Sequence, residues 1–310
     1  MTAQRYYAPG KLLLTSEYAV LDGALALALP LRLGQDMVVT ATAEHRSLHW
    51  QSYRRDGSCW LDVQFDPFTL QVLHEDVSGP VERLQSILQH IKQLAPDVPW
   101  AEGTRVQTHL EFDQSWGLGS SSTLLVNLAK WAHISVYALA DRTFGGSGYD
   151  LACGLADGPI IYQRREGSGH FLRCPFDPGF KEHLYFAYLG QKQDSREGIR
   201  HFRQRGIQPP VDTLSMLTLE LAHTTSWERF CDLLRQHEAL ISAVLGIRPL
   251  GQTHFSSFPG TVKSLGAWGG DFILLASKQP EYAVRHYLKD RGISTLISYE
   301  DWVLGPFGKN

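Results

Sequence analysis

The sequence predicts a globular protein that mixes β-strands and α-helices, in two domains or in one large one. The chain has 310 residues, and with ~150 residues in a typical domain this length can bury a sizeable core. Hydrophobic residues make up 43% of the chain, aromatic residues 11% and charged residues 20%, which is the balance of an ordinary globular protein and not of a disordered or fibrous one. Period-2 and helical hydrophobic patterns both occur along the chain, so both kinds of element are expected.

Charge, hydropathy and cysteine usage argue against several classes of protein. The net charge is −3 and no basic block is present, which argues against a nucleic-acid partner. The longest apolar run, Ala24–Leu31, is far shorter than the ~20 residues of a membrane span, and the first residues lack the pattern of a secretory signal. The four cysteines form no CxxC pair, which favours reduced thiols in the cytoplasm over a zinc site or a disulfide framework.

The first half of the chain alternates between strand and helix patterns. Residues 36–65 contain short β-rich stretches separated by turn residues, which predicts antiparallel sheet. Apolar residues at helical spacing predict a helix over Val81–Leu94, ended by Pro96. A strand is expected over Arg105–Phe112, followed by a tight glycine-serine loop and a helix from Thr123 to about Ala140.

The second half begins with a strand at Pro159–Gln163 and a polar, glycine-bearing stretch, Arg164–Gly169, where we place the domain boundary. The two expected domains therefore cover residues 1–165 and 166–310. The remaining expected elements are strands over 184–189 and 271–276 and helices over 212–224 and 227–245.

The sharpest local signal is the loop Gly117-Leu118-Gly119-Ser120-Ser121-Ser122, which leads into a helix. Glycines let the backbone approach a ligand, and a helix N-terminus offers unpaired N–H groups and the positive end of a dipole to an anion. The loop therefore has the form of a phosphate cradle. Its serine hydroxyls either cap the helix or bind phosphate and its metal ion, and both interpretations stay open on this segment alone. No Walker A or GxGxxG pattern accompanies the loop.

Three other segments combine glycines with charged residues. Near the N-terminus, Ala8-Pro9-Gly10-Lys11 forms a turn that presents a lysine, and Glu17 follows an apolar stretch. In the middle, Gly145-Gly146-Ser147-Gly148-Tyr149 leads to Asp150, and the glycines remove steric bulk around its carboxylate. Toward the C-terminus, Lys263–Asp271 contains a glycine turn before a buried strand. Each segment alone is also typical of a surface turn or a helix cap.

Together, in this order and at these separations, the four segments resemble the GHMP kinase superfamily, which includes galactokinase, homoserine kinase, mevalonate kinase and phosphomevalonate kinase. The resemblance runs the length of the chain, and two of the segments have the form seen in the mevalonate-pathway members. It implies an α+β fold, with an N-terminal α+β domain that binds ATP and contains a left-handed βαβ unit, and a C-terminal ferredoxin-like domain. It also implies ATP and Mg²⁺ as cofactors and a small-molecule acceptor as substrate.

The resemblance implies roles at the positions that match. Asp150 would accept the proton of the substrate hydroxyl, and Lys11 would stabilise negative charge close to it. Glu17, Gly269 and Gly270 would belong to the substrate site. These roles suit phosphoryl transfer, which depends mostly on positioning and charge neutralisation. The ATP phosphates would be held by Gly117, Leu118, Gly119, Ser120, Ser121 and Ser122, with Ser121 also a Mg²⁺ ligand.

Several positions depart from the family pattern. Leu139 stands where an acidic Mg²⁺ ligand is usual, so the nearby Asp141 is taken as its substitute. Tyr18 replaces a histidine that often follows the early glutamate, and Trp268 replaces a glycine of the third motif.

A further stretch after an expected strand corresponds to the basic, hydroxyl-rich substrate loop of the mevalonate-pathway members. Its side chains Lys192, Ser195 and Arg196 can bind a carboxylate or a phosphate, and a solvated loop is the alternative.

The leading functional hypothesis is an ATP-dependent small-molecule kinase of the mevalonate (isoprenoid) pathway. It transfers the γ-phosphoryl group to the alcohol of mevalonate or to the phosphate of phosphomevalonate, and with the second acceptor Asp150 would orient an anion and not act as a base. A diphosphomevalonate decarboxylase and a non-catalytic nucleotide- or metabolite-binding relative stay open as alternatives. A sugar or homoserine kinase fits the GGSGYD segment less well. No pattern marks an interface, and a homodimer stays open because dimers are common among enzymes.

Overall fold

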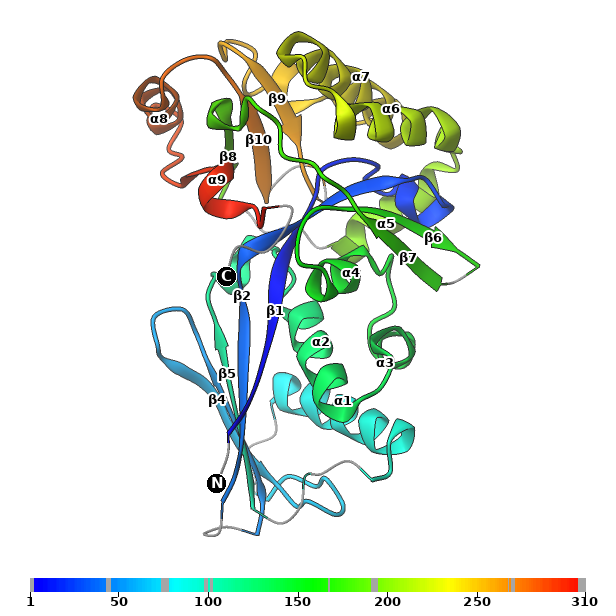
Figure 1. The fold of residues 1–310 in the computed structure, drawn as a ribbon, viewed down its shortest axis with the longest axis vertical. Helices are drawn as coiled ribbons and strands as arrows, with labels where there is room; N and C mark the ends of the chain where they lie inside the picture. Colours follow the sequence, from blue (N-terminus) through cyan, green and yellow to red (C-terminus); the bar gives the residue numbers. More distant parts are fainter. Residues whose placement is uncertain are drawn as a thin grey trace. The chain divides into compact units, whose positions relative to one another are not determined.

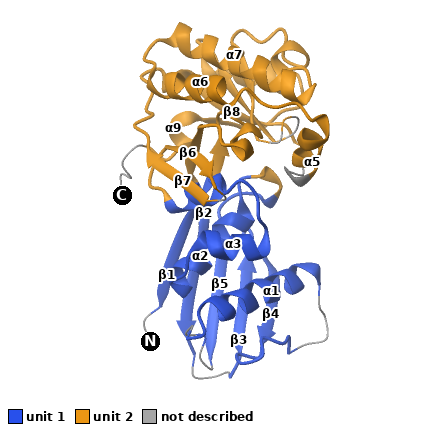
Figure 2. Ribbon diagram, turned by 90° about the vertical axis from the view of Figure 1, so that its right-hand side faces the viewer, with its two compact units in different colours: residues 1–10, 33–114, 118–155 blue, residues 11–32, 115–117, 156–310 orange. Residues whose placement is uncertain are grey.

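The computed structural model of the chain divides into two compact units (Figure 2). Unit 1 comprises Met1–Gly10, Leu33–Gln114 and Leu118–Leu155, and unit 2 comprises Lys11–Arg32, Ser115–Gly117 and Ala156–Asn310. The expected limits of 1–165 and 166–310 differ from these units, because the first two strands each run through both units and no single cut separates them. The structure describes residues 3–42, 46–73, 78–97, 100, 103–166, 168–190, 195–266, 268 and 271–305.

Unit 1 is built on a sheet in the order β4-β3-β5-β2 (Figure 1). The second half of β2 (Ala26–Ala41) pairs antiparallel with β5 (Thr104–Leu110), and β5 pairs parallel with β3 (Leu48–Tyr53). β3 pairs antiparallel with β4 (Cys59–Phe65), which confirms the expected antiparallel sheet for this part of 36–65. Residues 36–41 of β2 pair with β5 and not with β3. β1 (Gln4–Leu13) also pairs with β2. Every second residue of β3 is buried, because alternate side chains point to the same face.

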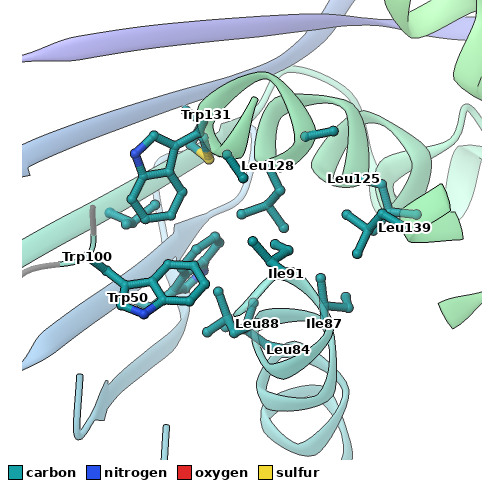
Figure 3. Packing of buried hydrophobic residues seen from close by; sticks show 14 of the residues in the cluster. Trp50, Leu84, Ile87, Leu88, Ile91, Trp100, Leu125, Leu128, Trp131 and Leu139 are labelled. Carbon is teal, nitrogen blue, oxygen red and sulfur yellow. The ribbon is translucent and has the colours of Figure 1, made fainter. Parts of the chain in front are cut away.

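The helices of unit 1 pack against this sheet through an apolar core (Figure 3). The expected helix at Val81–Leu94 is confirmed as α1, with Pro80 in its first turn, where the missing N–H is not needed. Burying its apolar face contributes ~1.5–3 kcal/mol for each large side chain. The indole rings of Trp100 and Trp131 lie 5.6 Å apart in the same core. The helices are α1 (Gly79–Leu94), α2 (Ser120–Ala132), α3 (Val136–Thr143) and α4 (Tyr149–Leu155), and the 3-10 helix η2 (Gln114–Trp116) precedes α2.

The helix expected from Thr123 to Ala140 is two helices, α2 and α3, and the single long helix was wrong. α2 ends at His133, whose φ of 52° lies in the left-handed region that terminates helices. α3 starts after Ser135, whose hydroxyl accepts a hydrogen bond from the N–H of Ala138. The apolar pattern continues across the break and therefore does not predict it. At the break the chain changes direction before it continues to Asp150.

Unit 2 contains a four-stranded antiparallel sheet in the order β11-β8-β10-β9. The chain runs through β8, a group of helices, β9, β10, one helix and then β11. This is the β-α-β-β-α-β order of a ferredoxin-like domain, as the resemblance implied. The strands are β8 (Leu184–Tyr188), β9 (Thr261–Ser264), β10 (Phe272–Ala276) and β11 (Leu296–Ser298).

The helices of unit 2 include the two that the sequence predicts at 212–224 and 227–245. They are confirmed as α6 (Val211–His223) and α7 (Trp227–Leu245). None of the helices in the described ranges combines the length and the apolar character needed to cross a membrane. The other helices are η1 (Ala19–Asp22), η3 (Lys181–His183), α5 (Ser195–Arg205), η4 (Leu250–Gln252), α8 (Glu281–Lys289) and α9 (Tyr299–Trp302).

The polar stretch at 164–169 is a hairpin turn and not a linker. β6 (Ile160–Arg165) pairs antiparallel with β7 (Ser168–Arg173), and Arg165 faces Ser168 across the turn. β6 also pairs with the first half of β2. Polar and glycine residues therefore mark a tight turn within unit 2 at this point.

Candidate active site

The glycine-serine loop leads into α2, as the sequence predicts. Gly119 is the N-cap of α2 and has a φ of 90°, a backbone conformation that glycine adopts without steric cost. Because glycine has no side chain, no side chain caps the start of this helix within the described residues. The first N–H groups of α2 are thus available to water or to an anion, at the positive end of the helix dipole.

The serines and the threonine at the start of α2 divide into two groups. The buried Ser122 donates its hydroxyl to the carbonyl of Gly119 at 2.8 Å, and Thr123 donates to the side chain of Gln35 on β2 at 2.8 Å. These two hydroxyls therefore stabilise the loop. Ser121 is exposed and Ser120 is partly exposed, so these two are the hydroxyls that a phosphate or its metal ion can reach. A structural role thus fits Ser122, and a role in binding phosphate stays open for Ser120 and Ser121.

The first motif meets the loop at Gly10. Pro9, Gly10 and Lys11 lie within strand β1 and do not form the expected turn. A Cβ atom on Gly10 would lie 3.0 Å from the carbonyl oxygen of Leu33 and 3.3 Å from that of Leu118. A larger residue would displace the loop, so the glycine serves close packing. Lys11 follows directly and is partly buried.

The C-terminal motif, Lys263–Asp271, is called the third motif here. It meets the loop at Gly117, where the chain has a φ of 68°. A Cβ atom on Gly117 would lie 2.6 Å from a carboxylate oxygen of the buried Asp271. Gly266, earlier in the same motif, also faces this carboxylate, since a Cβ atom placed on it would lie 3.5 Å from the same oxygen. The expected substrate residues Gly269 and Gly270 lie outside the described residues.

Asp150 lies in the first turn of α4, after Gly148 with a φ of 82°. The residue is partly buried. Tyr137 on α3 is an additional residue near it that sequence patterns did not single out. Burial, and then the charges of Asp150 and Cys153, raise the pKa of Tyr137 to about 12. Its buried hydroxyl has no hydrogen-bond partner in the part of the chain that the structure describes.

The expected metal ligands Ser121 and Asp141 are both exposed. Leu139, at the position where the family pattern has a carboxylate, is fully buried in the core of unit 1. Among the described residues, no three His, Cys, Asp or Glu side chains gather closely enough to hold a metal ion.

Glu17 lies in a buried cluster of unit 2 that also contains Lys263, Glu238 and His237, named the Glu17 cluster below. Glu17 is 1% exposed and Lys263 is 0% exposed. The Lys263 ammonium donates to Glu17 and lies 3.3 Å from Glu238. His237 Nε2 lies 3.7 Å from the second carboxylate oxygen of Glu17. The expected substrate residue is therefore enclosed by its own chain.

Burial governs the acidity of the Glu17 cluster. It raises the pKa of Glu17 to about 7, although the charge of Lys263 acts in the opposite direction. Burial likewise raises the pKa of Glu238 and, together with the charge of Lys263, lowers that of His237 well below its usual value. Since His237 Nε2 accepts a hydrogen bond from the Ser16 N–H at 2.7 Å, the imidazole is neutral with its proton on Nδ1.

The remaining expected substrate residues lie around the start of α5. Lys192 is outside the described residues, and Ser195 and Arg196 form the first turn of α5, with only their backbone described. Further along, Phe202 stacks on Tyr18 with ring centroids 5.6 Å apart. A Cβ atom on Gly198 would overlap the Tyr18 hydroxyl, so α5 packs closely on the residue that replaces the family's histidine.

Comparisons of the sequence identify no relative, whereas comparisons of the structure identify several. Scans against protein-family profiles and against curated proteins give no match. The phosphomevalonate kinase of Streptococcus pneumoniae in complex with phosphomevalonate and AMPPNP is similar with a TM-score of 0.71 and 18% identity, over 96% of this chain and 100% of that chain.

Two further structures extend this similarity across different acceptors. The mevalonate kinase of Methanococcus jannaschii has a TM-score of 0.68 and 14% identity, over 98% of each chain. The galactokinase of Lactococcus lactis, complexed with galactose, has a TM-score of 0.66 and 13% identity, over 98% of this chain and 94% of that chain. All three proteins are GHMP kinases. Together with the ferredoxin-like sheet, these likenesses show that the chain has the GHMP kinase fold.

Proposed function

We propose that the protein is an ATP-dependent phosphotransferase that acts on a small molecule, with mevalonate or phosphomevalonate as the acceptor. The observation that carries this proposal is the close packing of the glycine loop on two other motifs, through Gly10 against Leu118 within unit 1 and through Gly117 against Asp271 within unit 2. The start of α2, which no side chain caps, adds donors for an anion. A similar structure binds AMPPNP together with phosphomevalonate, which favours this pair of substrates.

The residues of the loop hold the phosphates of the nucleotide in this proposal. The N–H groups at the start of α2 and the hydroxyls of Ser120 and Ser121 face the phosphate oxygens, while Ser122 keeps the loop in shape. Ser121 would hold Mg²⁺ together with phosphate oxygens, and Asp141 is its expected acidic partner. Bound MgATP supplies the transferable phosphoryl group and neutralises its charge.

Asp150 and Lys11 act on the acceptor. With mevalonate, Asp150 accepts the hydroxyl proton as the new bond to phosphorus forms, and general base catalysis of this kind contributes ~10²–10⁴-fold. Lys11 stabilises the negative charge that develops. With phosphomevalonate no such proton needs to be removed, and Asp150 orients the acceptor.

ADP release with a panel of acceptors tests the proposal. Purified protein, ATP and Mg²⁺ are assayed with mevalonate, phosphomevalonate, diphosphomevalonate, homoserine and galactose, and Asp150→Asn serves as the control. We expect release with mevalonate or phosphomevalonate that the variant loses. Carbon dioxide release from diphosphomevalonate would instead identify a decarboxylase. AMPPNP binding without turnover of any acceptor would identify a non-catalytic binding protein. The observation that favours this alternative is Leu139, an apolar, buried residue at the position of the acidic Mg²⁺ ligand in the family pattern.

A further inference from the structure

The Glu17 cluster lies beside two segments whose backbone is strained. Ser16 and Tyr18 both have a φ of 62°, and Trp268 has a φ of 47°. Residues other than glycine persist in this region only where their surroundings hold them there. Tyr18 and Trp268 belong to one buried apolar cluster of unit 2. Two of the strained positions, one from the N-terminal motif and one from the C-terminal motif, therefore belong to the same core.

Hydrogen bonds from the Glu17 cluster hold both segments. On the first segment, the Ser16 N–H donates to His237 at 2.7 Å, and Lys263 donates to Glu17 itself. On the third, Lys263 donates to the Ser264 carbonyl at 2.6 Å, and the Ser264 N–H donates to Glu238 at 3.0 Å. Lys263 thus bonds to both segments at once, and it lies in β9, from which the chain continues to Asp271.

The charges of the Glu17 cluster do not balance when both carboxylates are ionised. Lys263 then provides one positive charge against two negative ones, because His237 is neutral. Glu17 Oε2 and His237 Nδ1 are buried without a hydrogen-bond partner in the described ranges. Among the described residues, the titratable groups that face Glu17 are Lys263 from β9 and Glu238 and His237 from α7. From α6, the hydroxyl of Thr218 lies 3.3 Å from that of Ser16.

We propose that Lys263 and Glu17 are positioning residues for nucleotide binding, because their buried ion pair holds the turn at residues 16–18 against β9, and β9 pairs with β10, which begins directly after Asp271. This inference rests on the proposed function. When Glu17 is ionised it draws Lys263 firmly to the turn. When Glu17 is protonated, Lys263 pairs mainly with Glu238, and its interaction with the turn that contains Glu17 weakens. Asp271, which abuts Gly117 within unit 2, transmits the difference to this first residue of the glycine loop.

The test is the affinity for AMPPNP with Mg²⁺, measured by calorimetry between pH 6 and pH 8.5. For the wild type we expect the affinity to rise on the order of tenfold around pH 7, where Glu17 loses its proton. Glu17→Gln should keep the weak affinity of the protonated form throughout. Glu238→Gln should move the midpoint to lower pH, because the charge of Glu238 raises the pKa of Glu17.

A matched control separates positioning from a purely structural role. Glu228→Gln neutralises an exposed glutamate that pairs with Lys278 at 3.3 Å, and its profile should follow the wild type. Protonation of the nucleotide itself affects all variants alike, so it cancels in the comparison. Melting temperatures from the same samples show that each variant is folded.

The outcomes distinguish this inference from the proposed function. If AMPPNP binds and the profile of Glu17→Gln follows the wild type, the inference is overturned and the proposed function stands. If the profiles differ as expected and no acceptor is phosphorylated, the positioning role stands and phosphotransfer fails. If AMPPNP does not bind the wild type at any pH, both fall.

Discussion

Asp150 and Glu17 are both carboxylates within segments that resemble kinase motifs, yet their surroundings differ. Asp150 lies in the first turn of a short helix and is partly buried, and its charge acts on Tyr137. Glu17 is enclosed with Lys263 and Glu238. A motif therefore identifies a position, while the distant chain segments packed on it decide what chemistry its side chain can perform.

Loss of turnover in Asp150→Asn should be the strongest consequence of this contrast. We expect kcat to fall by ~10²–10⁴-fold when a hydroxyl is the acceptor, because the amide cannot take the proton. AMPPNP affinity should be unchanged. Asp157→Asn, which neutralises an exposed aspartate paired with Arg173, should retain the wild-type rate in the same ADP-release assay. Near-normal turnover by Asp150→Asn would remove the assigned base.

Lys263→Met tests how much the buried ion pair of Glu17 contributes to stability. Removing the cation leaves Glu17 and Glu238 buried without a positive partner, and breaking such a pair costs ~3–5 kcal/mol of unfolding free energy. Urea denaturation measures the change. Lys278→Met, in an exposed pair with Glu228, should cost at most about 1 kcal/mol. Adding Glu17→Gln to Lys263→Met should recover part of the loss, and equal costs for the buried and exposed lysines would show that enclosure does not set Glu17 apart.

The pH dependence of stability isolates Glu17. Its pKa rises from 4.5 in the unfolded chain to about 7 in the folded protein, so the folded state retains a proton that the unfolded state releases. This contribution is fully present below pH 4.5 and is lost as the pH rises through about 7, a decrease on the order of 3 kcal/mol.

Glu17→Gln should lack this decrease. The quantity to compare is the difference in unfolding free energy between wild type and variant, measured by urea denaturation at pH 5 and pH 7.5. The wild type should lose stability relative to the variant between these two values. A difference that does not change with pH would show that Glu17 is ionised throughout.

Much of the fold follows from local sequence pattern, but specific breaks and pairings do not. The helix at Val81–Leu94 and the helix α7 have periodic apolar faces, and the structure confirms them. The hydrophobic periodicity did not predict the break at His133, because apolar residues continue across it. Ser135 is the type of residue that caps a helix, and it was the one local signal of the break. The turn expected at Pro9 and Gly10 is strand, because β1 pairs with β2, a partner that the local pattern does not indicate.

The candidate site divides in the same way. The glycine loop and Asp150 carry local signals, because glycines at short spacing precede the start of a helix in both. The burial of Glu17 depends on Lys263 and Glu238, and no spacing in the sequence connects them to it. Tyr137 likewise becomes relevant only because α3 places it near Asp150. The features of the site that the sequence did not predict therefore depend on packing between segments that are distant in the sequence.

The mildest change should come from the glycine loop. Gly117→Ala places a methyl group 2.6 Å from the Asp271 carboxylate at a φ of 68°, and we expect AMPPNP affinity to fall about tenfold, since displaced groups no longer match the phosphate. Gly57→Ala is the matched control, because Gly57 has a φ of 81° and nothing within 4 Å. It should cost about 1 kcal/mol of stability without changing affinity. Equal affinities for the two variants would mean that the contact with Asp271 does not shape the loop.

Phosphoryl transfer itself can be observed by ³¹P NMR of the wild-type protein with ATP, Mg²⁺ and mevalonate or phosphomevalonate. We predict ADP together with a new resonance, from a phosphate monoester with mevalonate or from a diphosphate with phosphomevalonate, and the loss of both in Asp150→Asn. A spectrum in which the nucleotide binds and ATP stays intact with both acceptors would contradict the proposed function.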